Sequence, residues 1–274
     1  MTVHVVTLNL RNTADRWRER RPLLVRQLVE LAPDVVGLQE VRMLPDQAAW
    51  IQREVDRVSG GCLRYTVYRR AKTGPAGLWE GIGVLARLPV VATAWLDLGA
   101  VVPAPRAARG GAKGRVAQVV TVRPPGGGLL DVYNTHLGLG GEGLRAAQAR
   151  RLVDWMGSRP RLPAVLLGDF NARPGSPTVS LLTDHLRSAF AEVHGHEPAR
   201  TVPTPLRRGA SGPGSVLDYV FVNDRLQVAA ARLVFDEVDR ADPTLAASDH
   251  YGLSVTLGLP TGLQGPLGAG RPPE

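Results

Sequence analysis

The sequence contains almost no cysteine and almost no lysine, and each shortage narrows what the protein can be. Cys62 is the only cysteine among 274 residues, which excludes an intrachain disulfide and a metal site built from cysteines. Lysine occurs only at Lys72 and Lys113, so 31 of the 33 basic residues are arginine. The net charge of +8 suits a polyanionic partner. With 31 glycines and 22 prolines beside it, the arginine bias also matches the residue usage of a GC-rich genome, so both explanations of the charge stay open.

Long apolar runs are also missing. No stretch reaches the roughly 18 apolar residues that a membrane helix requires, and Met1 leads at once into the strand-like Val3–Val6 rather than into a signal segment. We therefore expect no membrane span and a cytoplasmic location, and we expect the chain to be a monomer. Its length and 44% hydrophobic content fit one large globular domain, or at most two small ones. We place the folded domain at residues 1–258 and expect the Gly/Pro-rich residues 259–274 to be disordered.

Strands outnumber helices along the chain. Short runs rich in valine and leucine, bounded by glycine, proline, asparagine or aspartate, predict strands. These runs are Val3–Leu8, Val35–Leu38, Leu63–Tyr68, Gly81–Ala86, Val90–Leu98, Val116–Val122, Leu129–Thr135, Ala164–Leu167, Val216–Val222, Val228–Phe235 and Tyr251–Leu257. Apolar residues at helical spacing predict helices over 14–31, 45–58 and 142–156, and Ser176-Pro177 predicts the start of a shorter one.

Many of the predicted strands follow one another with hairpin-length gaps. A purely parallel sheet needs a crossover between each pair of strands, so the short gaps favour mixed, mostly antiparallel sheets. The fold class that we predict is therefore α/β, a layered sandwich in which two such sheets pack face to face with helices on both outer sides. Loops rich in glycine, proline and arginine lie at 71–79, 102–115 and 198–215.

Polar side chains stand where six of the predicted strands begin or end. The segments are Asn9, Gln39-Glu40, Asn134-Thr135-His136, Gly168-Asp169-Phe170-Asn171, Asp218 and Ser248-Asp249-His250. If these ends meet at one edge of the sandwich, they form a single polar cluster. In a chain without a cysteine cage, oxygen ligands such as Glu40, Asn9 and Asp249 favour a hard cation, Mg²⁺ or Mn²⁺. Such an ion, together with histidines oriented by carboxylates, suits the hydrolysis of phosphate esters.

Taken in order, these segments resemble the endonuclease/exonuclease/phosphatase superfamily, which includes deoxyribonucleases, abasic-site endonucleases, neutral sphingomyelinases and inositol-polyphosphate phosphatases. The resemblance runs from about residue 3 to residue 257, and the ordered set is far more specific than any one motif. It implies a four-layer α/β sandwich and a catalytic domain over residues 1–258. It also implies a Mg²⁺-dependent or Mn²⁺-dependent hydrolase that cleaves phosphate esters, with phosphodiesters as the leading substrates.

The resemblance implies a role for each matching residue. Glu40 is the expected principal metal ligand, with Asn9 beside it and Asp249 near the ion. Asp169 is expected to position or deprotonate the attacking water, and Asn171 to hold that water or a phosphate oxygen.

Two histidines complete the implied site. His250 is expected to contact the scissile phosphate, with Asp218 orienting its ring. His136 resembles the second histidine of the deoxyribonuclease and sphingomyelinase branches, a candidate general acid, and Glu80 matches the glutamate that pairs with it there. Whether Asp169 or His250 is the general base stays open.

One position departs from the pattern of the superfamily. Many members carry an acidic residue two positions after the first asparagine, where this chain has Arg11. The change removes one potential ligand and argues against a second tight metal site. Arg11 is instead a candidate for contacting a substrate phosphate, and Arg115, just before a strand, is another.

Three functions compete at this point. A nuclease is favoured by the basic balance and by the arginine-rich loops at 102–115 and 198–215, although these lack an obvious aromatic platform for stacking bases. A phosphoesterase for a lipid headgroup or a small-molecule phosphate, sphingomyelinase-like or inositol-phosphatase-like, is the alternative. A non-catalytic binding domain predicts a broken site, and apart from the change at Arg11 no central residue is missing here.

Overall fold

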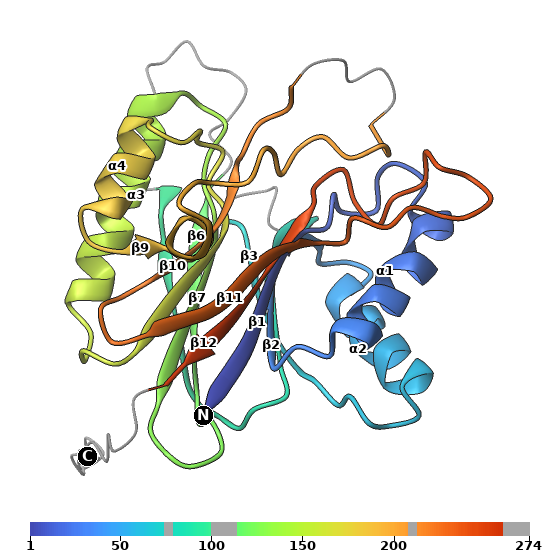
Figure 1. Ribbon diagram of the computed structural model, residues 1–274, viewed down its shortest axis with the longest axis horizontal. Helices are drawn as coiled ribbons and strands as arrows, with labels where there is room; N and C mark the ends of the chain where they lie inside the picture. Colours follow the sequence, from blue (N-terminus) through green and yellow to red (C-terminus); the bar gives the residue numbers. More distant parts are fainter. Residues whose placement is uncertain (74–78, 100–113, 208–212, 260–274) are drawn as a thin grey trace.

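Two six-stranded sheets form the centre of the protein (Figure 1). The structure is a computed structural model that describes residues 1–73, 79–99, 114–207 and 213–259. The strands of the first sheet are, in order, β11 (Gln227–Val234), β12 (Gly252–Gly258), β1 (Thr2–Asn9), β2 (Val35–Arg42), β4 (Glu80–Ala86) and β3 (Thr66–Ala71). Those of the second sheet are β5 (Val90–Asp97), β6 (Val116–Val122), β7 (Leu130–His136), β8 (Ala164–Asp169), β10 (Asp218–Val222) and β9 (Arg187–Ser188).

Helices cover the outer face of each sheet, so the fold has four layers (Figure 1). Helices α1 (Trp17–Leu31) and α2 (Gln47–Val58) lie against the first sheet, and α3 (Glu142–Gly157) and α4 (Pro177–Thr183) lie against the second. A shorter helix, α5 (Ala189–His194), contacts β10 and β11. The predicted four-layer α/β sandwich with two mixed sheets is confirmed.

The central strands are apolar on both faces because each sheet is buried on both sides. Along β8, Val165 and Leu167 pack between the two sheets, whereas Ala164 and Leu166 pack in the cluster that contains α3 and α4. Since side chains alternate between the faces of a strand, burial of both faces makes the strand an almost continuous apolar run in the sequence.

Most strand pairs are antiparallel, and the two parallel pairs determine where the strand ends lie. β1 pairs in parallel with β2 through the crossover α1, and β7 pairs in parallel with β8 through the crossover α3. Each parallel pair brings two carboxyl ends to the same edge of its sheet. Because β12 and β10 run antiparallel to β1 and β8, their amino ends lie at that edge too.

The predicted elements differ from the observed ones mainly at their ends. The strand expected at Leu63–Tyr68 begins later, as β3, because Leu63 and Tyr65 pack into the core beneath α1 and α2 before the strand starts. Ser176 caps α4 and Pro177 opens it, as predicted. The sequence analysis missed β9 and α5, since elements of two and six residues are too short for a periodic pattern.

Several predicted segments lie outside the described residues. They are residues 74–78 of the first loop, 102–113 of the second, 208–212 of the third, and 260–274 of the expected tail. Their interpretation stays a prediction, as does the domain boundary at residue 258. None of the helices in the described ranges has an apolar stretch of the length that a bilayer crossing needs.

Glycine is required at one point where two strands of the second sheet approach closely. Gly168 on β8 has a φ of 149° and pairs with Thr135 of β7, so an added Cβ would stand 2.1 Å from the carbonyl oxygen of Thr135. The next residue is Asp169, the last residue of β8. The glycine therefore lets β8 carry Asp169 to the edge of the sheet without forcing the strands apart.

Replacing Gly168 with alanine is expected to destabilise the fold by about 2 kcal/mol or more, because the added methyl group meets backbone that cannot move aside. Gly143→Ala on α3 is the matched control, since nothing lies within 4 Å of its added Cβ and alanine favours a helix. Urea unfolding of both variants measures the difference. Equal stabilities would refute the requirement for glycine.

Candidate active site

The candidate site residues stand on strand ends that meet at one edge of the sandwich. Asn9 ends β1, His136 ends β7 and Asp169 ends β8. Asp218 begins β10 directly opposite Asp169, and His250 lies two residues before β12. The topology therefore gathers side chains from positions 9 to 250 at this edge.

A bulge aims Glu40 into the same edge. The pairing of β2 with β4 shifts register between Leu38 and Val41, and Glu40 has a positive φ of 50°. A bulge turns a side chain out of the alternating pattern of its strand. Asn9 donates from Nδ2 to Glu40 Oε1 at 3.3 Å and to Asp169 Oδ2 at 2.9 Å. This amide joins a carboxylate of the first sheet to a carboxylate of the second.

Asp169 is almost completely buried and is held at both oxygens. Besides the bond from Asn9, its Oδ1 accepts from the backbone N–H of Asn171 at 2.9 Å. Burial, and then the charge of Asp218, raise the pKa of Asp169 above that of an ordinary aspartate. One ligand atom each from Asp169, Asp218 and His250 lie within 4.8 Å of one another.

His250 is a charged histidine held by a buried aspartate. Its Nδ1 lies 2.8 Å from Oδ2 of Asp218, which is 1% exposed. Burial by itself lowers the pKa of His250, but the charge and the hydrogen bond of Asp218, together with Asp169 and Asp249, raise it to about 10. The ring is therefore an imidazolium at neutral pH, and Nδ1 donates to Asp218.

His136 is a neutral histidine. Nδ2 of Asn171 donates to the Leu137 carbonyl at 2.9 Å, which fixes the orientation of the amide, and the same nitrogen lies 3.1 Å from Nε2 of His136. Nε2 therefore accepts, and the ring proton is assigned to Nδ1. Burial, and then the charges of Arg115 and Lys72, hold the pKa of His136 well below its ordinary value. Nδ1 is buried and has no hydrogen-bond partner within the described residues.

Two arginines border the acidic side chains. Arg115, just before β6, is 5% exposed, and its buried Nη1 has no hydrogen-bond partner in the described part of the chain. The charges of Asp169 and Glu40 act on this guanidinium. Arg11, in the loop after β1, places its Nε 3.5 Å from Oδ2 of Asp249. The acidic cluster therefore has permanent positive charge beside it.

The oxygen atoms of the site fit a hard divalent cation. The buried Oδ1 atoms of Asp218 and Asp249 have no hydrogen-bond partner among the residues that the structure describes, and such atoms are costly unless a ligand completes them. Glu40 adds a half-buried carboxylate, and carboxylate oxygens are the ligands that Mg²⁺ and Mn²⁺ take. Asn9 presents its NH₂ to the carboxylates while its Oδ1 accepts from the N–H of Arg11 at 2.9 Å, so in this arrangement it orients the acids.

Residues 6–250 match the Endonuclease/Exonuclease/phosphatase family. The chain belongs to this family. Its members are hydrolases that act on phosphate esters, and the resemblance drawn from the ordered motifs is confirmed. No curated protein is similar enough to this chain to be matched with it.

Solved structures share the fold of the family. An endonuclease/exonuclease/phosphatase from Bacteroides vulgatus is 20% identical, with a TM-score of 0.73 over 95% of this chain and 100% of that chain. One from Beutenbergia cavernae is 25% identical, with a TM-score of 0.70 over 94% of this chain and 72% of that chain. A mannosyl-6-phosphatase from Bacteroides thetaiotaomicron is 18% identical, with a TM-score of 0.74 over 94% of this chain and 100% of that chain.

Glu80 has a different partner from the one that the family resemblance implies. Glu80 begins β4 and forms an ion pair with Lys72, which is 5% exposed. In the described part of the chain, Glu80 is not paired with His136. Sequence reasoning gave Lys72 no role, because a lone lysine carries no motif. The only available signal was its rarity in a chain that uses arginine almost everywhere else.

Asn134 was also given no role of its own, although it joins the two sheets directly behind the site. Its Nδ2 donates to the carbonyl groups of Leu38 at 3.0 Å and Gly83 at 2.8 Å, and its Oδ1 accepts from Gln39 at 2.7 Å. This buried amide holds β7, which carries His136, against β4 and against β2, which carries Glu40.

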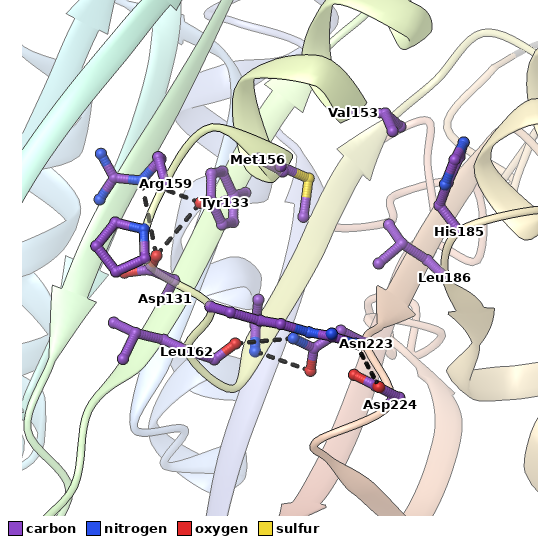
Figure 2. Close-up of a pocket in the computed structure, with 14 residues that line it drawn as sticks. Asp131, Tyr133, Val153, Met156, Arg159, Leu162, His185, Leu186, Asn223 and Asp224 are labelled. Atoms are coloured by element: carbon purple, nitrogen blue, oxygen red, sulfur yellow. Dashed lines mark hydrogen bonds and ion pairs between the residues drawn. The ribbon is translucent and has the colours of Figure 1, made fainter. Parts of the chain in front are cut away.

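A separate cavity of about 400 Å³ lies at the opposite end of the second sheet (Figure 2). Its lining includes Asp131, near the start of β7, whereas His136 ends the same strand. Asp131 and His136 are five residues apart along the strand, which places them roughly 16 Å apart. Asp131 accepts from the hydroxyl of Tyr133 at 3.2 Å and lies 3.7 Å from Nε of Arg159 (Figure 2). Because its buried acid is already satisfied, this cavity does not share the chemistry of the candidate site.

The charge of His250 is expected to depend on Asp218. In the Asp218→Asn protein the amide keeps the shape but removes the charge that raises the pKa, so the pKa of His250 should fall by about 1 to 3 pH units. An NMR titration of the metal-free protein measures this pKa without reference to activity. The exposed His196 serves as the internal control. An unchanged His250 titration in the variant would show that Asp218 does not hold the charge.

Proposed function

We propose that the protein is a Mg²⁺-dependent or Mn²⁺-dependent hydrolase that cleaves phosphodiesters. The observation that carries the proposal is the convergence of Asp169, Asp218 and His250 within 4.8 Å, beside the Asn9–Glu40 pair of the first sheet. Membership of the family supplies the reaction class, hydrolysis of a phosphate ester. The metal, the type of ester and the role of each residue belong to the proposal.

The groups that would hold the cation are Glu40 and Asp249, with Asn9 orienting Glu40. Their oxygen donors, and the unpartnered buried Oδ1 of Asp249, support this assignment. A divalent cation in this position supplies positive charge that neutralises phosphate oxygens and polarises the ester.

Asp169 is the general base of the proposed reaction. A proton already occupies each nitrogen of the His250 imidazolium, so this ring cannot accept another one at neutral pH. The raised pKa of Asp169 makes its carboxylate a stronger base than an ordinary aspartate, and hydrogen bonds from Asn9 and Asn171 orient both oxygens. Water attacks phosphorus, and its proton passes to Asp169. The bond from phosphorus to the leaving oxygen breaks, and that oxygen keeps the electron pair and takes a proton from solvent water.

Positive side chains stabilise the charge that grows on the phosphate. The His250 imidazolium, kept charged by Asp218, and the buried Arg115 guanidinium are two candidates. Neutral His136 offers a hydrogen bond from Nδ1 rather than the proton of a strong acid, which supports a binding role over the general-acid role that the resemblance implied. The role that we assign to Arg11 is to contact a phosphate group of the substrate.

Nucleic acid is the substrate that the charge of the chain favours. The net charge is +8, and Arg11 and Arg115 place permanent cations at the site. A lipid headgroup or small-molecule phosphate is the second candidate. It is favoured by Leu139, which is 76% exposed only three residues after His136 and would suit a substrate with an apolar part. A mannosyl-6-phosphatase with the same fold also makes a small phosphate ester a substrate to test.

The purified protein is expected to hydrolyse bis(p-nitrophenyl) phosphate with Mg²⁺ or Mn²⁺ and to lose this activity in EDTA. Asp169→Asn should lower kcat by about 10²- to 10⁴-fold because the base is lost, and His250→Ala should also lower kcat because it removes the charge that faces the phosphate. Asp224→Asn, an exposed carboxylate at the remote cavity, is the matched control. Full activity in the Asp169→Asn and His250→Ala proteins would refute the assigned chemistry.

A second assay separates the substrates. If nucleic acid is the substrate, the protein should nick supercoiled plasmid, and its affinity for DNA should fall steeply with salt because bound phosphates release counterions. Replacing Arg11 or Arg115 with methionine should then reduce the slope of log K against log salt by about one each. Parallel reactions contain sphingomyelin vesicles, inositol phosphates, mannose 6-phosphate and nucleotide monoesters. Turnover confined to one of these, with intact plasmid, would contradict the nuclease assignment.

A further inference from the structure

Arg20, near the start of α1, is the largest fully buried side chain among the described residues, with 0% of its surface exposed. Burying a guanidinium is costly unless its donors are satisfied. Here backbone carbonyl groups, rather than a paired carboxylate, accept its hydrogen bonds. The role of the buried guanidinium therefore depends on which segments of the chain these carbonyl groups belong to.

Five carbonyl groups receive the hydrogen bonds of this guanidinium. Nε donates to Asp15 at 3.0 Å and to Ala14 at 3.3 Å. Nη2 donates to Asn12 and Ala14, both at 3.0 Å, and more weakly to Arg11 at 3.4 Å. Nη1 donates to Ala247 at 2.8 Å. Four acceptors belong to the loop after β1, and the fifth belongs to the segment before β12, 227 positions from the arginine.

Both of these segments carry residues of the candidate site. The loop follows Asn9 and contains Arg11, and the other segment leads directly into Asp249 and His250. A second link runs alongside, because the hydroxyl of Ser248 donates to the carbonyl of Asn9 at 2.6 Å. The guanidinium therefore lies where two of the segments that carry site residues are joined.

The loop is held in a conformation that few residues adopt unaided. Arg11, Asn12 and Asp15 have φ values of 57°, 49° and 47°. Non-glycine residues keep such left-handed conformations when the surrounding structure compensates for their cost. The guanidinium supplies that compensation by giving the converging carbonyl groups a common donor, and the ring of Trp17 covers it with its centroid at 4.9 Å.

We propose that Arg20 is a positioning residue of the active site, which locks the loop after β1 to the segment before β12. In this way it fixes the separation between the Asn9–Glu40 side of the site and the Asp249–His250 side. The inference rests on the proposed function, since that function assigns the cation and the phosphate to the space between these two sides. A purely structural arginine would change stability alone, whereas a positioning residue also changes cation binding and turnover.

Arg20→Lys is the informative variant, because it keeps the charge and the buried stem. Lysine has one nitrogen with three donors, so it cannot span five carbonyl groups in two segments as the planar fork does. Leu24→Ala is the matched control. Leu24 lies one turn further along α1, is 0% exposed and packs in the core between α1, α2 and the first sheet, so its loss lowers stability without a contact to the site.

Three measurements are made at a temperature at which circular dichroism shows all proteins folded. For Arg20→Lys we expect Mn²⁺ binding, measured by EPR without substrate, to weaken by about tenfold or more. With bis(p-nitrophenyl) phosphate we expect kcat to fall more than KM changes. Hydrogen exchange should become faster in residues 9–15 and 245–250 together. For Leu24→Ala we expect a lower Tm but wild-type values in all three measurements.

The outcomes separate this inference from the proposed function. An inactive wild-type protein would refute the proposed function, while Mn²⁺ binding and hydrogen exchange would still decide the role of Arg20. If Arg20→Lys matches Leu24→Ala in both, Arg20 is only structural and the inference is wrong. If Arg20→Lys does not fold, the uncharged Arg20→Gln variant, which is easier to bury, takes its place with the same expectations.

Discussion

Four carboxylates gathered at one buried edge repel one another, and the rest of the site depends on how that repulsion is offset. The four are Glu40, Asp169, Asp218 and Asp249. Within the protein, the imidazolium of His250 offsets Asp218, and Arg11 lies beside Asp249. Burial, and then the negative charge of Asp218, raise the pKa of Asp169. The negative charge that is left also favours any divalent cation that enters. In the proposed function, this negative charge and its burial therefore provide both the general base and a place for a metal ion.

The elements that carry these groups differ in rigidity. Asn9, His136 and Asp169 stand on strand ends, so the packing between the sheets fixes their positions to within the tolerance of a close-packed core. Asp249 and His250 stand on a loop, and separate contacts must hold them. Asp218 orients the ring of His250, and carbonyl contacts tie the backbone of this loop to α1. The site is therefore as rigid as these few loop contacts allow.

The fold was predictable because its signals are local. Apolar runs, short gaps and periodic helical segments favour mixed sheets covered by helices, and the order of polar strand ends resembles that of the family. The pairing of Glu80 with Lys72 was not predictable, because it depends on which way the side chains point at the end of β3 and the start of β4. The contacts of Arg20 were not predictable either, because an arginine in a predicted helix is normally expected to be exposed to solvent. The tautomer of His136 depends on the orientation of the Asn171 amide, which the sequence does not specify.

The two histidines show why a motif alone does not assign their roles. In water they would have the same pKa, and both stand at the same edge of the fold. Asp218 raises the pKa of His250 until the ring is charged, whereas burial with Arg115 and Lys72 nearby keeps His136 neutral. When their environments push the pKa values of two titrating groups apart in this way, the two groups can take different roles. A charged ring can neutralise a phosphate but cannot take a proton from water, so the proposed reaction gives the role of base to Asp169, the carboxylate near both rings.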